Sequence, residues 1–429
     1  MVIKDKQKAD MLTLIRDVPG RYPLIYILLF LFPLMGAFAR HWFSTFFILI
    51  SLTSIYGLIR RYGTEYTPLQ REEKIVLGGV ALFFLAYFLP SVIHPFTINS
   101  LEVEIRYLLF IPIYLLVREM ERPHLWLFFG LAAGAACIFG YAMYELLVVG
   151  IAQHSYKIHG AYINHYYGSI AVVTAFVALG SMYGLEKRLR WIFILAFCLG
   201  LVSAILSGAR GSYVMAFSVA VLWGYLRLKT RIFIMFIGLI TIVVISLYSF
   251  STNVKYQIDR AIDDVKYYFI LDEFSEVELE ARSASVRLEL WAHSLSIIAD
   301  HPLLGIGRGN FEDVVRGYMT EDQKEDPLLV HSHPHNAYLE VLVSKGLIGG
   351  LAFAMMFFYP MVIFFRDYRK SADTSLPGIM LLSTFFVYSL SEVPFIKGNG
   401  TAVYLILLAV TFSYHIKQSR TWNCQDQME

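Results

Sequence analysis

The residues IFIMFIGLITIVVISLYS, at positions 232–249, contain no charged side chain and no alternation of polar and apolar positions. An α-helix needs about 20 apolar residues to cross the hydrocarbon core of a bilayer. A strand of a membrane barrel would instead alternate between apolar and polar residues. This stretch therefore predicts a membrane-spanning α-helix, and it decides the fold class because similar runs recur along the chain.

The composition agrees with a chain built from such runs. Of the 429 residues, 57% are hydrophobic and 16% are charged, whereas about 25% of the residues of a soluble domain are charged. This composition excludes a cytosolic enzyme and a disordered chain, and a net charge of +2 gives no field that would attract a nucleic acid. We predict an all-α polytopic membrane protein with about twelve transmembrane helices. The predicted spans are 22–39, 42–59, 75–93, 100–117, 125–149, 168–185, 191–207, 212–226, 232–249, 346–365, 376–394 and 400–416.

The basic residues of the short connections predict the orientation. Lys and Arg are enriched in the cytoplasmic loops of membrane proteins. With the N-terminus in the cytoplasm, 22 of these residues fall on the cytoplasmic side and 5 on the opposite side. Both termini are therefore expected in the cytoplasm. The five on the outer side are Arg40, Arg106, Lys157, Arg210 and Lys397.

One outer connection, residues 250–345, is much longer than the others and holds 17 of the 34 acidic residues. Loops longer than about 15 residues are uncommon unless they have a function. Within it, Ser285–Ile298 predicts an amphipathic helix that ends before His301-Pro302. The loop is therefore expected to be partly helical. The predicted regions are transmembrane helices in 1–249, a large outer loop in 250–345, and transmembrane helices with a short tail in 346–429.

Arg210 lies in Leu206–Ser212 (LSGARGS), a tight turn between two predicted spans. Gly208 and Gly211 allow the backbone to turn or to approach a ligand closely. Backbone N–H groups of such a turn, together with a guanidinium, suit a phosphate. The alternative is an arginine that only ends a helix and extends to the interface. We favour the phosphate site.

Two other basic residues on the outer side, Arg106 and Lys157, are weaker candidates for a functional role. The apolar run Tyr107–Val117 is too short to cross the bilayer, so Arg106 is expected at or below the outer interface, beside Glu102 and Glu104. Such a residue is a candidate for function, and the alternative is a Glu–Arg pair in which each partner only satisfies the other. Lys157 lies in a loop dense in Tyr, His and Asn, a composition that is also typical of an interfacial aromatic belt.

Three histidines, His331, His333 and His335, precede the span that begins near 346. A metal site is a weak interpretation, because Pro334 prevents a regular helix and no acidic or thiol cluster completes the ligand set. Nearby arginines disfavour the charged form of a histidine, and a neutral imidazole can act as a general base. Asn336 is a candidate to orient that base or to bind substrate.

Two further segments carry motif-like residues. Arg287 lies on the predicted amphipathic helix, and its spacing alone favours an arginine on a solvated face. The segment 305–310 (GIGRGN) does not have the spacing of a dinucleotide-binding fingerprint and does not follow a strand. It is predicted to be a turn of the outer loop.

Taken together, the segments resemble the O-antigen ligase/polymerase family. Residues 207–212 resemble its S-x-S-R-G signature, although Ala209 replaces the second serine. Residues 285–311 resemble its R-x-x-x-W … H-P-L-L-G-x-G-x-x-x-F stretch, and 333–349 resemble its H-x-H-N-x-x-L … G-L-x-G stretch. Residues 157–164, including Lys157 and Asn164, resemble an upstream R-x-x-G … N loop in which lysine replaces the commoner arginine.

The resemblance implies an inner-membrane glycosyltransferase of the C-type (GT-C) superfamily. Such enzymes take a glycan from undecaprenyl diphosphate on the periplasmic side, and the ligase branch passes it to lipid A–core. The family is regarded as independent of metals and other cofactors, and the resemblance implies no nucleic-acid partner. It implies that arginines bind the diphosphate and that a histidine acts as base or as a further diphosphate ligand. Together with the residues singled out above, the resemblance gives Arg210, Arg287 and His335 as predicted catalytic residues. The predicted substrate-binding residues are Lys157, Asn164, His333 and Asn336 from the motifs, and Arg106 from its position at the outer interface.

Other functions stay open at this point. An O-antigen polymerase shares the donor and most of the motifs. A protein O-oligosaccharyltransferase shares them too, although such proteins often carry a soluble C-terminal region, and residues 417–429 form only a short tail. A transporter with twelve helices is the alternative from another class. The long outer loop and the lack of an internal repeat argue against it.

Overall fold

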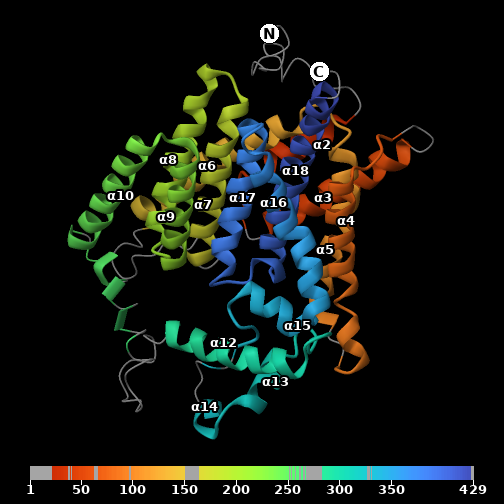
Figure 1. Ribbon diagram of the computed structural model, residues 1–429. Coiled ribbons are helices and arrows are strands. Elements are labelled where there is room, and N and C mark those ends of the chain that lie inside the picture. Colours follow the sequence, from red (N-terminus) through yellow and green to blue (C-terminus); the bar gives the residue numbers. More distant parts are fainter. Residues whose placement is uncertain are drawn as a thin grey trace.

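The computed structural model describes residues 22–36, 39, 41–61, 66–95, 98–149, 164–250, 252, 254–256, 258–259, 262–263, 266, 283–325, 329 and 331–426. Within these residues the chain forms helices and no β-strand (Figure 1). The all-α prediction is therefore confirmed for the described part of the chain.

The helices follow the predicted spans closely. Each of the twelve predicted ranges overlaps a helix. Their bounds are α2 Pro23–Leu31, α3 Trp42–Arg60, α4 Arg71–Leu85, α5 Leu101–Val117, α6 Pro123–Tyr144, α7 Asn164–Ser181, α8 Arg190–Leu206, α9 Arg210–Arg227, α10 Thr230–Phe250, α15 Ala337–Phe353, α16 Tyr359–Asp367, α17 Ala372–Ser389 and α18 Gly398–Asp426. The outer loop holds α12 Ser283–Asp300, α13 Phe311–Val315 and α14 Glu321–Glu325. A π-helical turn joins α15 to α16.

The predicted count of twelve spans is not confirmed. Among the described residues, eight helices are long and apolar enough to cross a membrane. Of the remaining predicted spans, α2 has only 9 residues, and α5 has 17 and carries Glu102, Glu104 and Arg106 in its first turns. Helices α9 and α17 are 18 residues long but more polar. Length and composition therefore support eight of the twelve predicted spans. They do not support the four predicted spans that correspond to α2, α5, α9 and α17.

The most buried helices lie at the centre of the bundle. Helix α7 packs against α6, α8, α9 and α17, and α17 also packs against α18. The most apolar windows of α7 and α18 are each 89% buried, whereas that of α10 is 0% buried. Helix α10 therefore lies at the edge of the bundle (Figure 1), where an all-apolar surface suits lipid.

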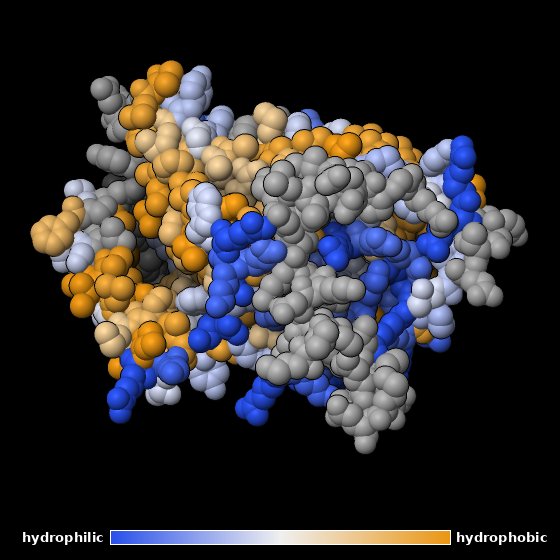
Figure 2. Space-filling view, turned by 90° about the horizontal axis from the view of Figure 1, so that it is seen from above, coloured by the Kyte–Doolittle hydropathy of each residue, from blue (hydrophilic) through white to orange (hydrophobic). Residues whose placement is uncertain are grey.

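The two ends of the bundle differ. Helices α12, α13 and α14 lie together at one end, here named the loop end, and α18 ends at the opposite end, here named the tail end (Figure 1). Seen from the tail end, hydrophobic residues lie along the left and upper margins of the molecule, and hydrophilic residues are seen in the middle, at the lower margin and at the right (Figure 2). Hydrophobic margins of this kind are expected where the sides of a bundle contact lipid.

The outer loop has a small core of its own. Helix α12 is amphipathic as predicted, because Val286, Leu290 and Ile297 are all buried. They pack with apolar residues of the loop and with Val343 of α15. The helix ends at Asp300, directly before the His301-Pro302 dipeptide. The loop is therefore a packed unit that is attached to α15.

Helix α15 begins at Ala337 rather than near 346, and it is broken at Gly346, where φ is 59°. The break leaves backbone N–H and C=O groups of α15 without partners inside the helix. Backbone groups of the segment 302–307 supply the missing hydrogen-bond partners. The N–H groups of Ile306 and Gly307 donate to the carbonyls of Val343 and Ser344 at 2.8 and 3.1 Å. The N–H of Leu347 donates to the carbonyl of Pro302 at 2.8 Å. The outer loop is thus hydrogen-bonded into the interrupted helix, which satisfies the backbone there.

Gly346 allows this contact because it lacks a side chain. A Cβ atom at position 346 would lie 2.3 Å from the backbone of Leu303, and its positive φ is unfavourable for any other residue. Gly346→Ala should therefore destabilise the protein by about 2–4 kcal/mol, visible as a lower midpoint of thermal unfolding in detergent. Gly317→Ala is the matched control, because nothing lies within 4 Å of a Cβ there. Equal midpoints for the two variants would contradict this account.

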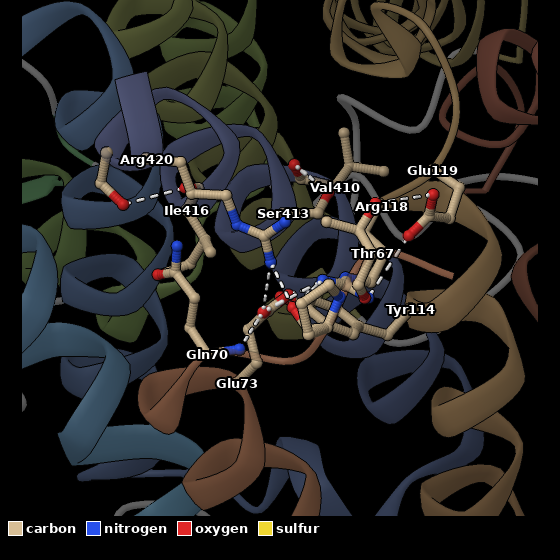
Figure 3. Close-up of polar contacts among 12 residues, drawn as sticks. Thr67, Gln70, Glu73, Tyr114, Arg118, Glu119, Val410, Ser413, Ile416 and Arg420 are labelled. Carbon is tan, nitrogen blue, oxygen red and sulfur yellow. Dashed lines mark hydrogen bonds and ion pairs between the residues drawn. The ribbon is translucent and has the colours of Figure 1, made fainter. Parts of the chain in front are cut away.

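A buried ion network joins α4, α5 and α18 near the tail end (Figure 3). Glu73, of which 1% is exposed, accepts from Arg118 Nε at 2.8 Å, from Arg420 Nη2 at 3.0 Å and from the Tyr114 hydroxyl at 2.9 Å. Its carboxylate also accepts from the N–H of Gln70 at 2.7 Å, which caps α4. The network fixes the three helix ends relative to one another, because breaking a fully paired buried charge is costly.

Candidate active site

A buried carboxylate lies at the loop end of the bundle, in the turn after α17. Glu392 is 5% exposed. Its Oε1 lies 3.7 Å from His165 Nε2, 3.7 Å from Arg287 Nη2 and 3.8 Å from His335 Nδ1. Its Oε2 lies 3.2 Å from Lys397 Nζ. These five residues, here named the Glu392 cluster, come from four separate parts of the chain.

The charges around Glu392 decide its protonation state. Burial alone would raise the pKa of its carboxyl group, but His335, Lys397 and His165 together hold the pKa well below its usual range. Glu392 is therefore ionised at neutral pH. The two permanent cations Arg287 and Lys397 outnumber this one carboxylate, so the cluster keeps an excess of positive charge.

The R-x-x-x-W pattern explains how Arg287 reaches the cluster. Arg287 and Trp291 are four residues apart on α12 and therefore lie on one face of the helix. Trp291 Nε1 donates to the carbonyl of Pro334 at 3.0 Å, which ties this face to the segment that carries His335. Arg287 faces the distant Glu392, and its side chain is 29% exposed, so it does not lie on a fully solvated face of the helix.

The segment 331–336 holds His335 in an unusual backbone conformation, with φ at 52°. The His335 N–H donates to His333 Nδ1 at 3.3 Å, and the two rings are 4.3 Å apart between centroids. Asn336 caps α15 by accepting from the N–H groups of Tyr338 and Leu339 at 3.0 and 3.1 Å. His333 and Asn336 thus shape the segment that presents His335, and their predicted contacts with substrate remain predictions.

His333 makes the stability of this segment depend on pH. Burial first, and then the neighbouring His335 and Lys397, lower the pKa of His333 to about 3, whereas a histidine of an unfolded chain titrates near about 6.5. Between these values the unfolded state binds more protons, so stability is lost as the pH falls below about 6.5. In His333→Gln, the fall in unfolding midpoint between pH 7.5 and pH 5 should be smaller than in the wild type. An equal fall would contradict the assignment.

Arg210 is the first residue of α9, and Gly208 before it has a φ of 65°. The predicted turn between two helices is therefore confirmed. A Cβ on Gly211 would lie 3.4 Å from Ser391 Oγ, so the start of α9 packs beside the turn that carries Glu392. Free N–H groups and the helix dipole at such a start favour an anion. The structure thus places Arg210 near the cluster, and its phosphate contact remains a prediction.

Arg106 has structural partners. It is 3% exposed, its Nη2 donates to Glu102 at 2.5 Å, and its Nη1 donates to Ser44 Oγ at 3.1 Å and to the Gly398 carbonyl at 2.7 Å. The Glu–Arg pair on α5 is therefore present, Arg106 is not one of the five residues of the Glu392 cluster, and its contact with substrate remains a prediction. Its contact with Gly398 lies one residue from Lys397.

The remaining predicted site residues lie partly outside the described chain. Lys157 lies outside the described residues, and Asn164 is the first residue of α7. Glu392 and His165 were not among the site residues predicted from the sequence. The signal that could have found Glu392 is an acidic residue within the apolar range predicted as a span, because ionisable residues at such depth are functional candidates.

Comparisons with known proteins relate part of the chain to one family. Residues 193–354 match the sequence model of the family described as O-Antigen ligase, a range that contains Arg210, Arg287 and His335. The chain is 31% identical over 110 residues to an O-antigen ligase of Pseudomonas aeruginosa, a match that covers 26% of this chain and 24% of that protein. It is 22% identical over 393 residues to an uncharacterized protein of Haemophilus influenzae, which covers 85% of this chain and 97% of the relative.

The apolar helices and these matches define a multi-pass inner-membrane protein of glycosyltransferase type. Residues 193–354 therefore resemble the O-antigen ligase family, and a shorter match to one such ligase agrees with this. Glu392 and Lys397 lie beyond the matched range, so the structure, and not the family match, connects them with the motif residues.

Proposed function

We propose that this protein is an O-antigen ligase. It would transfer a glycan from undecaprenyl diphosphate to a sugar hydroxyl of lipid A–core, at the periplasmic face of the inner membrane. The observation that supports this most is the Glu392 cluster, which brings Arg287 and His335 from separate motifs to one carboxylate. The enrichment of basic residues at the opposite end supports a periplasmic loop end.

The cluster suits a diphosphate leaving group. Arg287 Nη2 lies 3.7 Å from Glu392 Oε1, which is longer than a charge-assisted hydrogen bond of about 2.7–2.9 Å. The guanidinium could therefore turn to a stronger anion without breaking a short bond to Glu392. With Lys397 and the nearby start of α9, it would stabilise the negative charge that grows as the bond from the anomeric carbon to the phosphate oxygen breaks.

His335 is suited to activate the acceptor. With a proton on Nδ1 and Glu392 beside it, Nε2 would take the proton from the acceptor hydroxyl as its oxygen attacks the anomeric carbon. Glu392 then stabilises the imidazolium, and undecaprenyl diphosphate leaves with the bonding electron pair. A single displacement of this kind inverts the anomeric centre. The other role for His335, as an imidazolium that binds the diphosphate, predicts that its loss weakens donor binding as well as turnover.

Reconstitution tests the proposed function. The purified protein is mixed with glycan-loaded undecaprenyl diphosphate and rough lipopolysaccharide in EDTA, with parallel samples that lack the acceptor. Laddered lipopolysaccharide that requires the acceptor is the expected product. Longer lipid-linked glycan without use of the acceptor would instead establish a polymerase. Glycan on serine would establish a protein transferase, and movement of donor across the bilayer without product would establish a transporter.

A further inference from the structure

The turn that follows Glu392 is held by backbone contacts from α5. The Tyr107 hydroxyl donates to the carbonyl of Phe395 at 2.6 Å, and Arg106 Nη1 donates to that of Gly398 at 2.7 Å. These carbonyls lie on both sides of Lys397, whose ammonium group contacts Glu392. Helix α5 therefore fixes the backbone that presents this cation.

A third contact comes from the outer loop. Arg308 lies between Gly307 and Gly309, whose φ angles of 84° and 94° shape the predicted turn. Its Nη1 donates to Glu104 Oε1 of α5 at 3.0 Å, and its Nη2 donates to the carbonyl of Ile396. One guanidinium thus joins the outer loop, α5 and the residue directly before Lys397.

Glu104 connects the same contact to the broken helix. It is 1% exposed, and its Oε2 accepts from Lys345 Nζ at 2.7 Å. Lys345 precedes the break at Gly346, in the helix whose start carries the His335 segment. The buried carboxylate therefore holds both sides of the Glu392 cluster at a fixed separation, through Arg308 on one side and Lys345 on the other.

We propose that Arg308 is a positioning residue for the transfer reaction. By joining Glu104 to the Ile396 carbonyl, it fixes the turn 394–398 and with it the placement of Lys397 and Glu392 against the leaving diphosphate. This role rests on the proposed function. It differs from the catalytic roles above because the side chain of Arg308 is only 9% exposed and its guanidinium is bonded to Glu104 and to the Ile396 carbonyl.

The chemistry of the guanidinium predicts a specific defect. Lysine at 308 keeps the positive charge beside Glu104, so the buried carboxylate stays paired and the fold is retained. It lacks the planar pair of donors that reaches two acceptors in fixed geometry. The Ile396 carbonyl then loses its partner while Glu104 does not. Because the affected charges act most strongly on the leaving group, kcat falls while KM for the donor changes little.

The test compares Arg308→Lys with Arg316→Lys, a matched arginine of the same loop that is exposed and paired with Glu312. Arg308→Lys should lower kcat at least about tenfold with KM within about twofold, and Arg316→Lys should leave both unchanged. Unchanged kcat in Arg308→Lys, or equal losses in both variants, would overturn the proposal.

Amide hydrogen exchange supplies a readout that does not depend on transfer. Exchange at 394–398 should be faster in Arg308→Lys than in the wild type and unchanged in Arg316→Lys, while α13 exchanges alike in all three. Unchanged exchange at 394–398 would overturn the positioning role even if the protein is a ligase. A third outcome is faster exchange at 394–398 in Arg308→Lys together with no glycan transfer by the wild type. That outcome would contradict the proposed function and still establish the contact of Arg308 with the turn.

Discussion

Replacing His335 by alanine should lower the rate of glycan transfer by about 10²–10⁴-fold, the usual contribution of a general base. The reason is local, because the imidazole lies beside the ionised Glu392, with 3.8 Å between Nδ1 and Oε1. The protein should remain folded, since His335 belongs to neither hydrophobic core. The measurement is the initial rate of lipopolysaccharide formation with saturating donor and acceptor.

Two further variants separate the imidazole from its backbone. His335→Asn keeps a residue that tolerates the positive φ at this position, so it should lose activity as alanine does without added backbone strain. His293→Ala removes another histidine of the outer loop, which lies on α12 outside the Glu392 cluster, and should retain full activity. Near-normal transfer by His335→Asn would refute the base assignment.

Replacing Arg287 by glutamine should lower transfer by about 10²–10³-fold, the cost of removing one donor that stabilises a developing anion. Glutamine keeps a hydrogen-bonding group but removes the charge. In contrast to His335→Ala, this variant should also bind undecaprenyl diphosphate more weakly, because the charge acts on the bound anion itself. The measurements are the initial rate and the affinity for undecaprenyl diphosphate.

Two control variants separate the charge of Arg287 from a general effect of changing an arginine in this loop. Arg287→Lys keeps the charge on the same face of α12 and should recover part of the lost rate, although it lacks bidentate geometry. Arg316→Gln removes an exposed arginine from the same loop and should change neither quantity. Equal affinity for undecaprenyl diphosphate in wild type and Arg287→Gln would show that this arginine does not bind the leaving group.

Much of the fold was predictable, because apolar runs and amphipathic periods act locally. Helix α12, with Val286, Leu290 and Ile297 on its buried face, followed from spacing alone. The start of α15 did not, because it depends on the capping side chain of Asn336 and on a break at Gly346 that another segment fills. Contacts between distant backbone groups leave little trace in a local pattern.

Site residues that belong to a sequence motif were predictable. Site residues that only the fold brings together were not. Arg287 and His335 were identified through resemblance, whereas spacing alone had favoured a solvated surface for Arg287. Arg106 had two interpretations, and the structure shows its 2.5 Å contact with Glu102 while its contact with substrate stays a prediction. Glu392 was missed because His165, Arg287 and His335 lie far away in sequence and only the fold brings them to it.

The central claim is that the Glu392 cluster binds the diphosphate leaving group. The most direct test is the affinity for undecaprenyl diphosphate without glycan, in nanodiscs and EDTA, for wild type, Arg287→Gln and Arg316→Gln. The account predicts that Arg287→Gln binds at least about tenfold more weakly, a loss of about 1.4 kcal/mol, while Arg316→Gln binds as the wild type does. Equal binding by all three proteins would contradict it.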